Sequence, residues 1–274
     1  MSKTSIVSGG EVTVKFLTLR KKGKKAFIPY IMAGYPSEED TVRITGLLEE
    51  CGADIMELGV PFTDPLADGP VIQAASEEAL RQGMNLRKVL RLVERLKNTS
   101  SIPIVLMTYY NPVFKYGEEN FIRDALNSGV SGVIIPDLPP DEAPSLRKAA
   151  RKTGLDTIFL AAPTSTPERL RLIAKASTGF IYYVSITGIT GSKLILDGSQ
   201  KYIIETLRKL TDKPIATGFG VSTPEEAKAV AEFSDGVIVG SSIVKRLTGS
   251  VGGEVTVREL KSYISHIAEA IHSN

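Results

Sequence analysis

Three acidic residues stand close together in the segment MELGVPFTDPLADGP, residues 56–70, among apolar residues and prolines. Glu57 belongs to the apolar run 53–59, which reads as a buried strand, and Asp64 and Asp68 follow it. Burial disfavours the ionised form of a carboxyl group and raises its pKa, which suits the group to proton transfer near neutral pH. The competing interpretation is a buried glutamate paired with a cation, but no basic residue lies inside any predicted strand.

The loop that carries Asp64 and Asp68 contains three prolines, which limit its freedom. A stiff loop can hold a carboxylate in a fixed position over the end of a strand. Both aspartates could instead be turn formers or helix caps, since Asp68-Gly69-Pro70 also resembles a helix start. The spacing alone leaves these two interpretations open.

Two glycine-rich segments predict a second kind of site. TGFG (217–220) ends one predicted strand, VGSS (239–242) ends the next, and a short helix is expected directly after it. Backbone N–H groups and a helix N-terminus can bind a phosphate without a basic side chain. Glycines that only permit tight turns are the alternative, but two such segments at consecutive strand ends favour a phosphate.

Scarce residue types restrict the chemistry further. The chain has one cysteine, Cys51, and two histidines, His266 and His272, both in the last predicted helix. This distribution argues against a zinc site, a Ser-His-Asp triad and a Cys-His dyad. A Schiff-base aldolase would need a lysine inside the fold, and the predicted strands contain none.

The elements that must position these residues are strands alternating with amphipathic helices. The strands are predicted at 26–34, 53–59, 103–109, 132–137, 156–163, 179–186, 214–220 and 236–242. They are continuously apolar, which is typical of a parallel sheet buried on both faces. Eight strand–helix units in 274 residues predict an α/β fold, a (β/α)8 TIM barrel, as a single domain over residues 1–274.

An open doubly wound sheet is the main competitor. Its first strand usually ends in a Gly-rich turn, whereas MAGYPSEED has one glycine at that place. In the barrel the active site lies at the carboxyl ends of the strands, where Glu57 and the glycine-rich segments would meet. Strand alternation puts Glu57 on the same face as Ile55, toward the barrel interior.

The remaining features concern mobility and location. SITGITGSK (185–193) is small, polar and long for its position, and it predicts a lid, with a linker as the alternative. Residues 1–14 are expected to form a loose N-terminal leader. A net charge of +2 argues against nucleic-acid and membrane partners. One cysteine and no signal peptide predict a cytoplasmic protein.

Five segments together resemble the alpha subunit family of tryptophan synthase: ELGVPFTDPLADGPVIQ, PDLPPDE, SITGITG, TGFGVSTPEE and GSSIV. The similarity covers nearly the whole chain, from FIPYIMAGYP to GSSIVK. It implies a lyase of tryptophan biosynthesis that cleaves indole-3-glycerol phosphate to indole and glyceraldehyde 3-phosphate in a retro-aldol step.

The resemblance also implies roles for single residues. Glu57 matches the general acid–base that protonates the indole ring carbon, and Asp68 matches the carboxylate that accepts the indole N–H. Tyr182 matches the active-site tyrosine and Thr190 the lid threonine. Substrate contacts are implied for the phosphate at Gly191, Gly220, Gly240 and Ser241, and for the indole at Tyr30, Leu106, Ile134, Leu160 and Phe219. Tyr30 and Pro136 stand where some members have Phe and Ala.

The resemblance implies no metal and no cofactor in this chain. Pyridoxal phosphate is expected only in a partner, the beta subunit, which receives indole in an alpha–beta–beta–alpha complex. Asp64, Pro65 and Asn111 match the interface with it. Two alternatives stay open: a free-standing indole-3-glycerol-phosphate lyase that releases indole, and a barrel that only binds a partner. The presence of both Glu57 and Asp68 argues against the second.

Overall fold

The computed structural model describes residues 10–184, 198–218, 220–247 and 254–273. Its strands are all parallel and form one sheet in the order β5-β4-β3-β2-β1-β9-β8-β7-β6. They are β1 (Ala26–Met32), β2 (Met56–Gly59), β3 (Ile104–Met107), β4 (Gly132–Ile134), β5 (Asp156–Ile158), β6 (Leu160–Ala161), β7 (Ile181–Val184), β8 (Ile215–Gly218) and β9 (Gly236–Val239).

The sheet closes into a barrel at Phe159, the one residue between β5 and β6. β5 pairs with β4 and β6 pairs with β7, so the two are halves of a single strand that joins both ends of the sheet. When β5 and β6 are counted as one, the described strands form an eight-stranded barrel, which confirms the predicted (β/α)8 fold.

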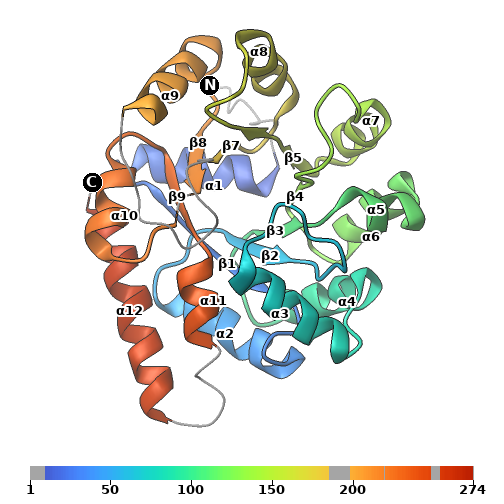
Figure 1. Cartoon of the computed structure of the whole chain (residues 1–274), viewed down its shortest axis with the longest axis vertical. Coiled ribbons are helices and arrows are strands. Elements are labelled where there is room, and N and C mark those ends of the chain that lie inside the picture. Colours follow the sequence, from blue (N-terminus) through green and yellow to red (C-terminus); the bar gives the residue numbers. More distant parts are fainter. Residues whose placement is uncertain (1–9, 185–197, 219, 248–253, 274) are drawn as a thin grey trace, which may run out of the picture.

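Helices surround the barrel (Figure 1). They are α2 (Glu38–Glu50), α3 (Pro70–Arg81), α4 (Leu86–Lys97), α5 (Tyr110–Tyr116), α6 (Glu118–Asn127), α7 (Pro144–Thr153), α8 (Pro167–Ala176), α9 (Ser199–Leu210), α10 (Pro224–Ala231), α11 (Ser241–Leu247) and α12 (Glu254–His272). Local signals start several of them: the Ser37 side chain caps α2, and Thr223 and Glu226 form a capping box on α10. None of the helices in the described ranges has the length and apolar character to cross a bilayer.

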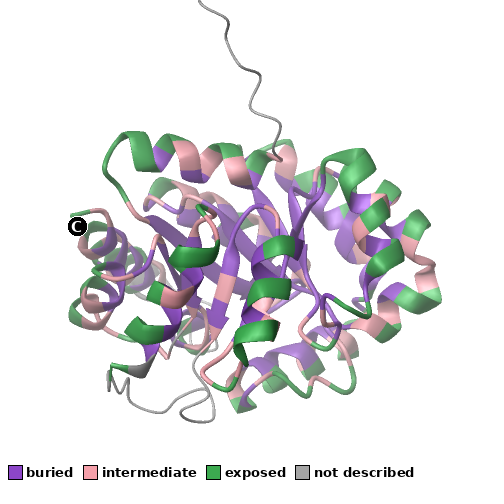
Figure 2. Ribbon diagram, turned by 90° about the horizontal axis from the view of Figure 1, so that it is seen from above, coloured by how far each residue is buried: buried purple, intermediate pink, exposed green. Residues whose placement is uncertain are grey.

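Side-chain alternation along the strands produces two apolar layers. The barrel interior contains Ile28, Ile55, Val105, Ile134, Ile158, Ala216 and Ile238. The residues between them in sequence, such as Met56 and Leu58, pack outward against the helices. Figure 2 shows the buried strands at the centre and the exposed residues on the outer sides of the helices.

Helix α1 (Glu11–Lys21) closes the amino end of the barrel. Its buried residues Val12, Phe16 and Leu19 belong to the same apolar cluster as the barrel interior. The prediction of a loose leader over 1–14 is therefore wrong for residues 11–14, while residues 1–9 lie outside the described part. Residues 11–14 are Glu-Val-Thr-Val, and their β-branched side chains give little local preference for a helix. Packing against the barrel therefore decides the structure here.

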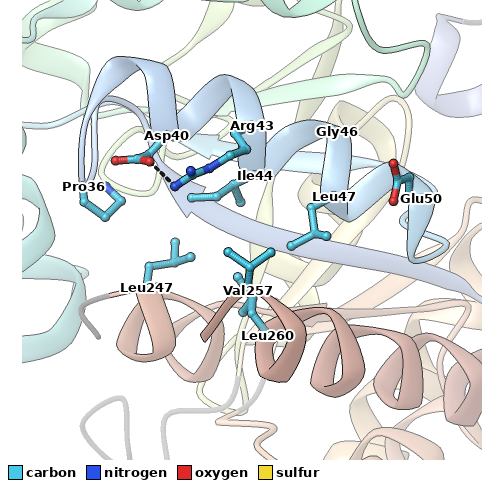
Figure 3. Close-up of a pocket in the computed structure, with 10 residues that line it drawn as sticks. All are labelled: Pro36, Asp40, Arg43, Ile44, Gly46, Leu47, Glu50, Leu247, Val257 and Leu260. Atoms are coloured by element: carbon cyan, nitrogen blue, oxygen red, sulfur yellow. Dashed lines mark hydrogen bonds and ion pairs between the residues drawn. The ribbon is translucent and has the colours of Figure 1, made fainter. Parts of the chain in front are cut away.

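The helical layer holds a cavity of about 230 Å³ between α2, α11 and α12 (Figure 3). Its walls are largely apolar, with Ile44 and Leu47 facing Leu260. The Arg43–Asp40 ion pair lies at its edge. The cavity is outside the barrel and contains none of the residues predicted to act in the site.

Candidate active site

Glu57 points into the barrel from β2, where it is aligned with Tyr30 of β1 and Val105 of β3. Its side chain is 1% exposed, and neither carboxyl oxygen has a hydrogen-bond partner among the described residues. Burial, and then the charge of Asp68, raise the pKa of Glu57 to about 8. The group is thus mostly protonated at neutral pH and can donate a proton.

Asp68 lies in the loop after β2 and is fixed by Tyr109. The Tyr109 hydroxyl donates a hydrogen bond to Oδ2 of Asp68 at 3.0 Å and accepts one from the Ala67 N–H at 3.0 Å. The Phe62 ring stacks on Tyr109 with ring centres 5.3 Å apart. Burial raises the pKa of Asp68 to about 6, although the Tyr109 hydrogen bond acts in the opposite direction. Asp68 is therefore mostly ionised at pH 7.

The two aspartates of the loop do different things. Helix α3 begins after Gly69, which provides no side-chain cap, so the helix-cap interpretation of Asp68 is wrong. Asp64 is exposed, accepts a hydrogen bond from the Thr63 hydroxyl at 2.6 Å, and its carbonyl accepts one from the Leu66 N–H at 3.0 Å. Asp64 is a turn former, and Asp68 is the one that faces the site.

Two further tyrosines complete the site. Burial raises the pKa of Tyr30 and of Tyr182, and the charges of Glu57 and Asp68 raise both further. The two hydroxyls therefore lie within electrostatic range of both carboxyl groups. Gly59 is required beside Tyr30, because a Cβ at this position would overlap the Tyr30 hydroxyl.

Gly218 has the same relation to Tyr182. A Cβ at Gly218 would lie 2.5 Å from the Tyr182 hydroxyl oxygen, which leaves no room for a larger residue. The glycines at the ends of β2 and β8 thus leave space for both tyrosine rings. Tyr109 and Gly59 were not predicted to belong to the site, and Gly218 was predicted only as part of the glycine-rich segment 217–220. The only available signal was their place at the carboxyl ends of strands.

The apolar wall of the site differs from the prediction at one position. Ile134 and Leu160 face the barrel interior, as expected. Leu106 does not: it is fully buried but packs in the outer layer, so its placement in the indole pocket is wrong. The inward residues of β3 are Val105 and Met107, because successive side chains point to opposite faces. Met107 takes the place that was predicted for Leu106.

The two glycine-rich segments lie together at the same end of the barrel. Helix α11 begins at Ser241, and the Gly240 carbonyl accepts hydrogen bonds from the Ile243 and Val244 N–H groups. The Ser242 hydroxyl donates to the Val221 carbonyl at 2.8 Å, which joins the segment after β9 to the one after β8. Gly220 and Gly240 are thereby held near each other. The predicted contacts at Thr190, Gly191 and Phe219, and the predicted lid at 185–193, lie outside the described residues.

The predicted partner-facing residues are accessible. Asp64 and Asn111 are exposed and Pro65 is partly exposed. Two large apolar side chains stand beside them in sequence, Leu66 at 92% exposure and Phe114 at 66%. In the described part of the chain, no group of three or more histidine, cysteine or acidic side chains could hold a metal ion.

The fold and the site define a parallel (β/α)8-barrel enzyme with two carboxyl groups of different pKa, one buried and one partly buried, at the carboxyl ends of its strands. A family model described as "Tryptophan synthase alpha chain" matches residues 16–272. The chain belongs to the tryptophan synthase alpha chain family.

Several relatives carry that name. The protein of Picosynechococcus sp. is 46% identical over 261 residues, which is 95% of this chain and 98% of that protein. The protein of Dehalococcoides mccartyi is 51% identical over 222 residues, with 81% and 87% coverage. Among solved structures, ligand-free tryptophan synthase from M. tuberculosis has a TM-score of 0.87 at 36% identity, covering 96% of this chain and 99% of that one. The alpha subunit from Legionella pneumophila also has a TM-score of 0.87 at 36% identity, with 96% and 98% coverage.

Family membership carries the activity with it. The chain is a lyase of tryptophan biosynthesis that cleaves indole-3-glycerol phosphate. The alpha chain family has no cofactor of its own, and pyridoxal phosphate belongs to the beta subunit.

Proposed function

We propose that Glu57 and Asp68 are the two catalytic groups of this reaction. The observation that carries the assignment is the separation of their pKa values, about 8 for Glu57 and about 6 for Asp68, at one barrel mouth. Two carboxyl groups whose environments separate their pKa values are suited to different roles in acid–base catalysis. At neutral pH Glu57 is the acid and Asp68 is the anion.

In the cleavage, Glu57 first donates one proton and then takes up another, so it ends the reaction in its starting protonation state. Its carboxyl proton goes to the indole ring carbon that bears the side chain, and Asp68 accepts the indole N–H and stabilises the positive charge that develops on the ring. The Glu57 carboxylate removes the proton of the adjacent side-chain hydroxyl while the carbon–carbon bond breaks. The electrons of the broken carbon–carbon bond return to the indole ring, and the side-chain fragment leaves as an aldehyde. Glu57 holds the hydroxyl proton and is again the neutral acid.

We assign the rest of the substrate to the groups around these carboxyls. The indole ring lies against Tyr30, Met107, Ile134 and Leu160. Tyr182 is the third catalytic residue, beside Glu57 and Asp68. Backbone groups at Gly220, Gly240 and Ser241 bind the phosphate. This assignment is supported by the inward direction of the apolar residues and by the hydrogen bond that joins the two glycine-rich segments. For Thr190, Gly191 and Phe219 we keep the roles that the family resemblance implies: the lid threonine, a phosphate contact and an indole contact.

The test of the acid–base assignment is Glu57→Gln, which keeps the shape of the side chain and removes its proton. We expect release of indole from indole-3-glycerol phosphate to fall by about 10²–10⁴-fold, the contribution of a positioned general acid–base. Asp64→Asn is the matched control, because it removes a carboxylate from the same loop but outside the site, and its activity without a partner should match wild type. Undiminished cleavage by Glu57→Gln would exclude the mechanism.

We infer also that the chain works with a beta subunit, through a surface that includes Asp64, Pro65 and Asn111. Solved relatives that match the whole barrel are tryptophan synthase structures, and the surface here is exposed and partly apolar. A free-standing lyase is the alternative, and full turnover without a beta subunit would favour it. We further propose a single barrel domain, which the continuous order of the described strands supports. We also propose a cytoplasmic location, for which the single cysteine is the support.

A further inference from the structure

A second, larger cavity lies at the amino end of the barrel, opposite the active site. It has a volume of about 750 Å³, and α1, α7 and the segments that lead into β5, β7 and β8 form its walls. Much of the lining is apolar, from Phe16, Leu17, Ala150, Leu155 and Pro214. We call it the floor cavity. Its volume falls within the range of about 300–1,000 Å³ typical of small-molecule sites.

Three basic residues from different elements line the floor cavity. They are Arg20 in the last turn of α1 and Arg151 in α7, both exposed to solvent, and the partly buried Lys213 just before β8. Within the described ranges none of the three forms an ion pair, although Arg43, Arg81, Arg95, Arg123, Arg169, Arg171 and Arg208 do. Burial and the charge of Arg151 lower the pKa of Lys213, which shows that the two cations are near each other.

Two carboxyl groups, Asp156 and Asp212, also line the cavity, so three basic residues face two acidic ones. The Lys213 ammonium donates to the Ala174 carbonyl at 2.6 Å in the last turn of α8, where the helix dipole favours a cation, and it forms no ion pair with a carboxylate of the described residues. Asp156 accepts from the Thr13 N–H at 3.4 Å and from the Thr178 hydroxyl, and burial raises its pKa. Asp212 is exposed and forms no ion pair with another described residue.

We propose that the floor cavity binds a small organic anion, with a carboxylate or phosphate between Arg151 and Lys213 and an apolar, ring-sized body against the partly exposed Leu17 and Pro214. An anion at this place can accept charge-assisted hydrogen bonds from two cations that form no ion pair with any described residue. The apolar wall buries the rest of the molecule. The floor cavity shares no residue with the active site, so binding there does not depend on the catalytic assignment.

The test is a titration of the full chain, labelled with ¹⁵N and followed by NMR, with benzoate, phenyl phosphate and neutral benzyl alcohol. We expect both anions to cause saturable shifts at the amides of Thr13, Gly154 and Gly179, which line the cavity, and benzyl alcohol to bind far more weakly. Tighter binding of phenyl phosphate would identify a phosphate as the natural group, and tighter binding of benzoate a carboxylate.

Matched variants decide whether the cations make the site. Arg151→Gln should weaken binding of the anions by about tenfold or more, the loss expected when a charge-assisted hydrogen bond is removed. Lys152→Gln changes the same charge on the same helix outside the cavity and should leave the affinity unchanged; Arg20→Gln is a second loss variant. The proposal is overturned if the shifts do not saturate, if they occur only near Gly59 and Gly240, or if Arg151→Gln and Lys152→Gln bind equally.

Discussion

At the scale of single residues, the same functional group has two different protonation states within one site. Glu57 is fully buried and has no hydrogen-bond partner among the described residues, whereas Asp68 is partly exposed and accepts a hydrogen bond from Tyr109. Burial disfavours the anion at both positions, but less at Asp68, where the Tyr109 hydrogen bond stabilises the carboxylate; at neutral pH Glu57 is therefore the neutral acid and Asp68 the anion. The different protonation states of the two carboxyl groups therefore follow from their different burial and from the Tyr109 hydroxyl that donates to Asp68.

This difference predicts a bell-shaped pH dependence of kcat/KM. Activity should rise with pH through about 6, as Asp68 loses its proton, and fall through about 8, as Glu57 loses the proton it must donate. The measurement is initial-rate indole release from pH 5 to pH 9. Activity that continues to increase above the pKa of Glu57 would contradict the role of Glu57 as an acid.

Tyr109 is predicted to act through Asp68. Tyr109→Phe removes the hydrogen bond that lowers the pKa of Asp68, so the acidic limb of the pH profile should move to higher pH. We expect about a tenfold loss of kcat/KM near pH 6.5, equivalent to one hydrogen bond to a charged group. Tyr110→Phe is the control, since that hydroxyl donates to Glu118 at 3.0 Å, outside the site. A uniform loss of activity with an unmoved acidic limb would indicate a purely structural role.

At the scale of elements, α1 is the part of the fold that the sequence pattern missed. Phe16 is 3% exposed and packs on Phe180 with ring centres 5.5 Å apart, so α1 completes the apolar core of the barrel. Phe16→Ala should lower the free energy of unfolding by about 3–5 kcal/mol, measured by urea denaturation. Val14→Ala, at a position 46% exposed on the same helix, should change it by no more than about 0.5 kcal/mol. Similar values for the two variants would mean that α1 is not part of the core.

At the scale of the whole molecule, the surface around Leu66 and Phe114 is the feature that points beyond the chain. We expect Phe114→Ala to reduce the stimulation of indole release by an added beta subunit by about tenfold, as for an exposed aromatic that becomes buried at an interface. Tyr202→Ala removes another exposed aromatic, from α9 on a different side of the barrel (Figure 1), and should have no effect. Equal stimulation of both variants would indicate that the beta subunit binds a different surface of this chain.

The sequence by itself determined the barrel, the inward direction of Glu57 and the scarcity of metal-binding side chains. These are local properties: continuous apolar runs, alternation along a strand and composition. Alternation along β3 places Leu106 and Met107 on opposite faces, but only the structure showed that Met107 is the one that faces inward. Only the tertiary structure decided that Asp68 faces Tyr109, that α1 closes the barrel and that Arg20, Arg151 and Lys213 line one cavity. Each of these depends on contacts between segments far apart in the chain, which form only when the barrel closes.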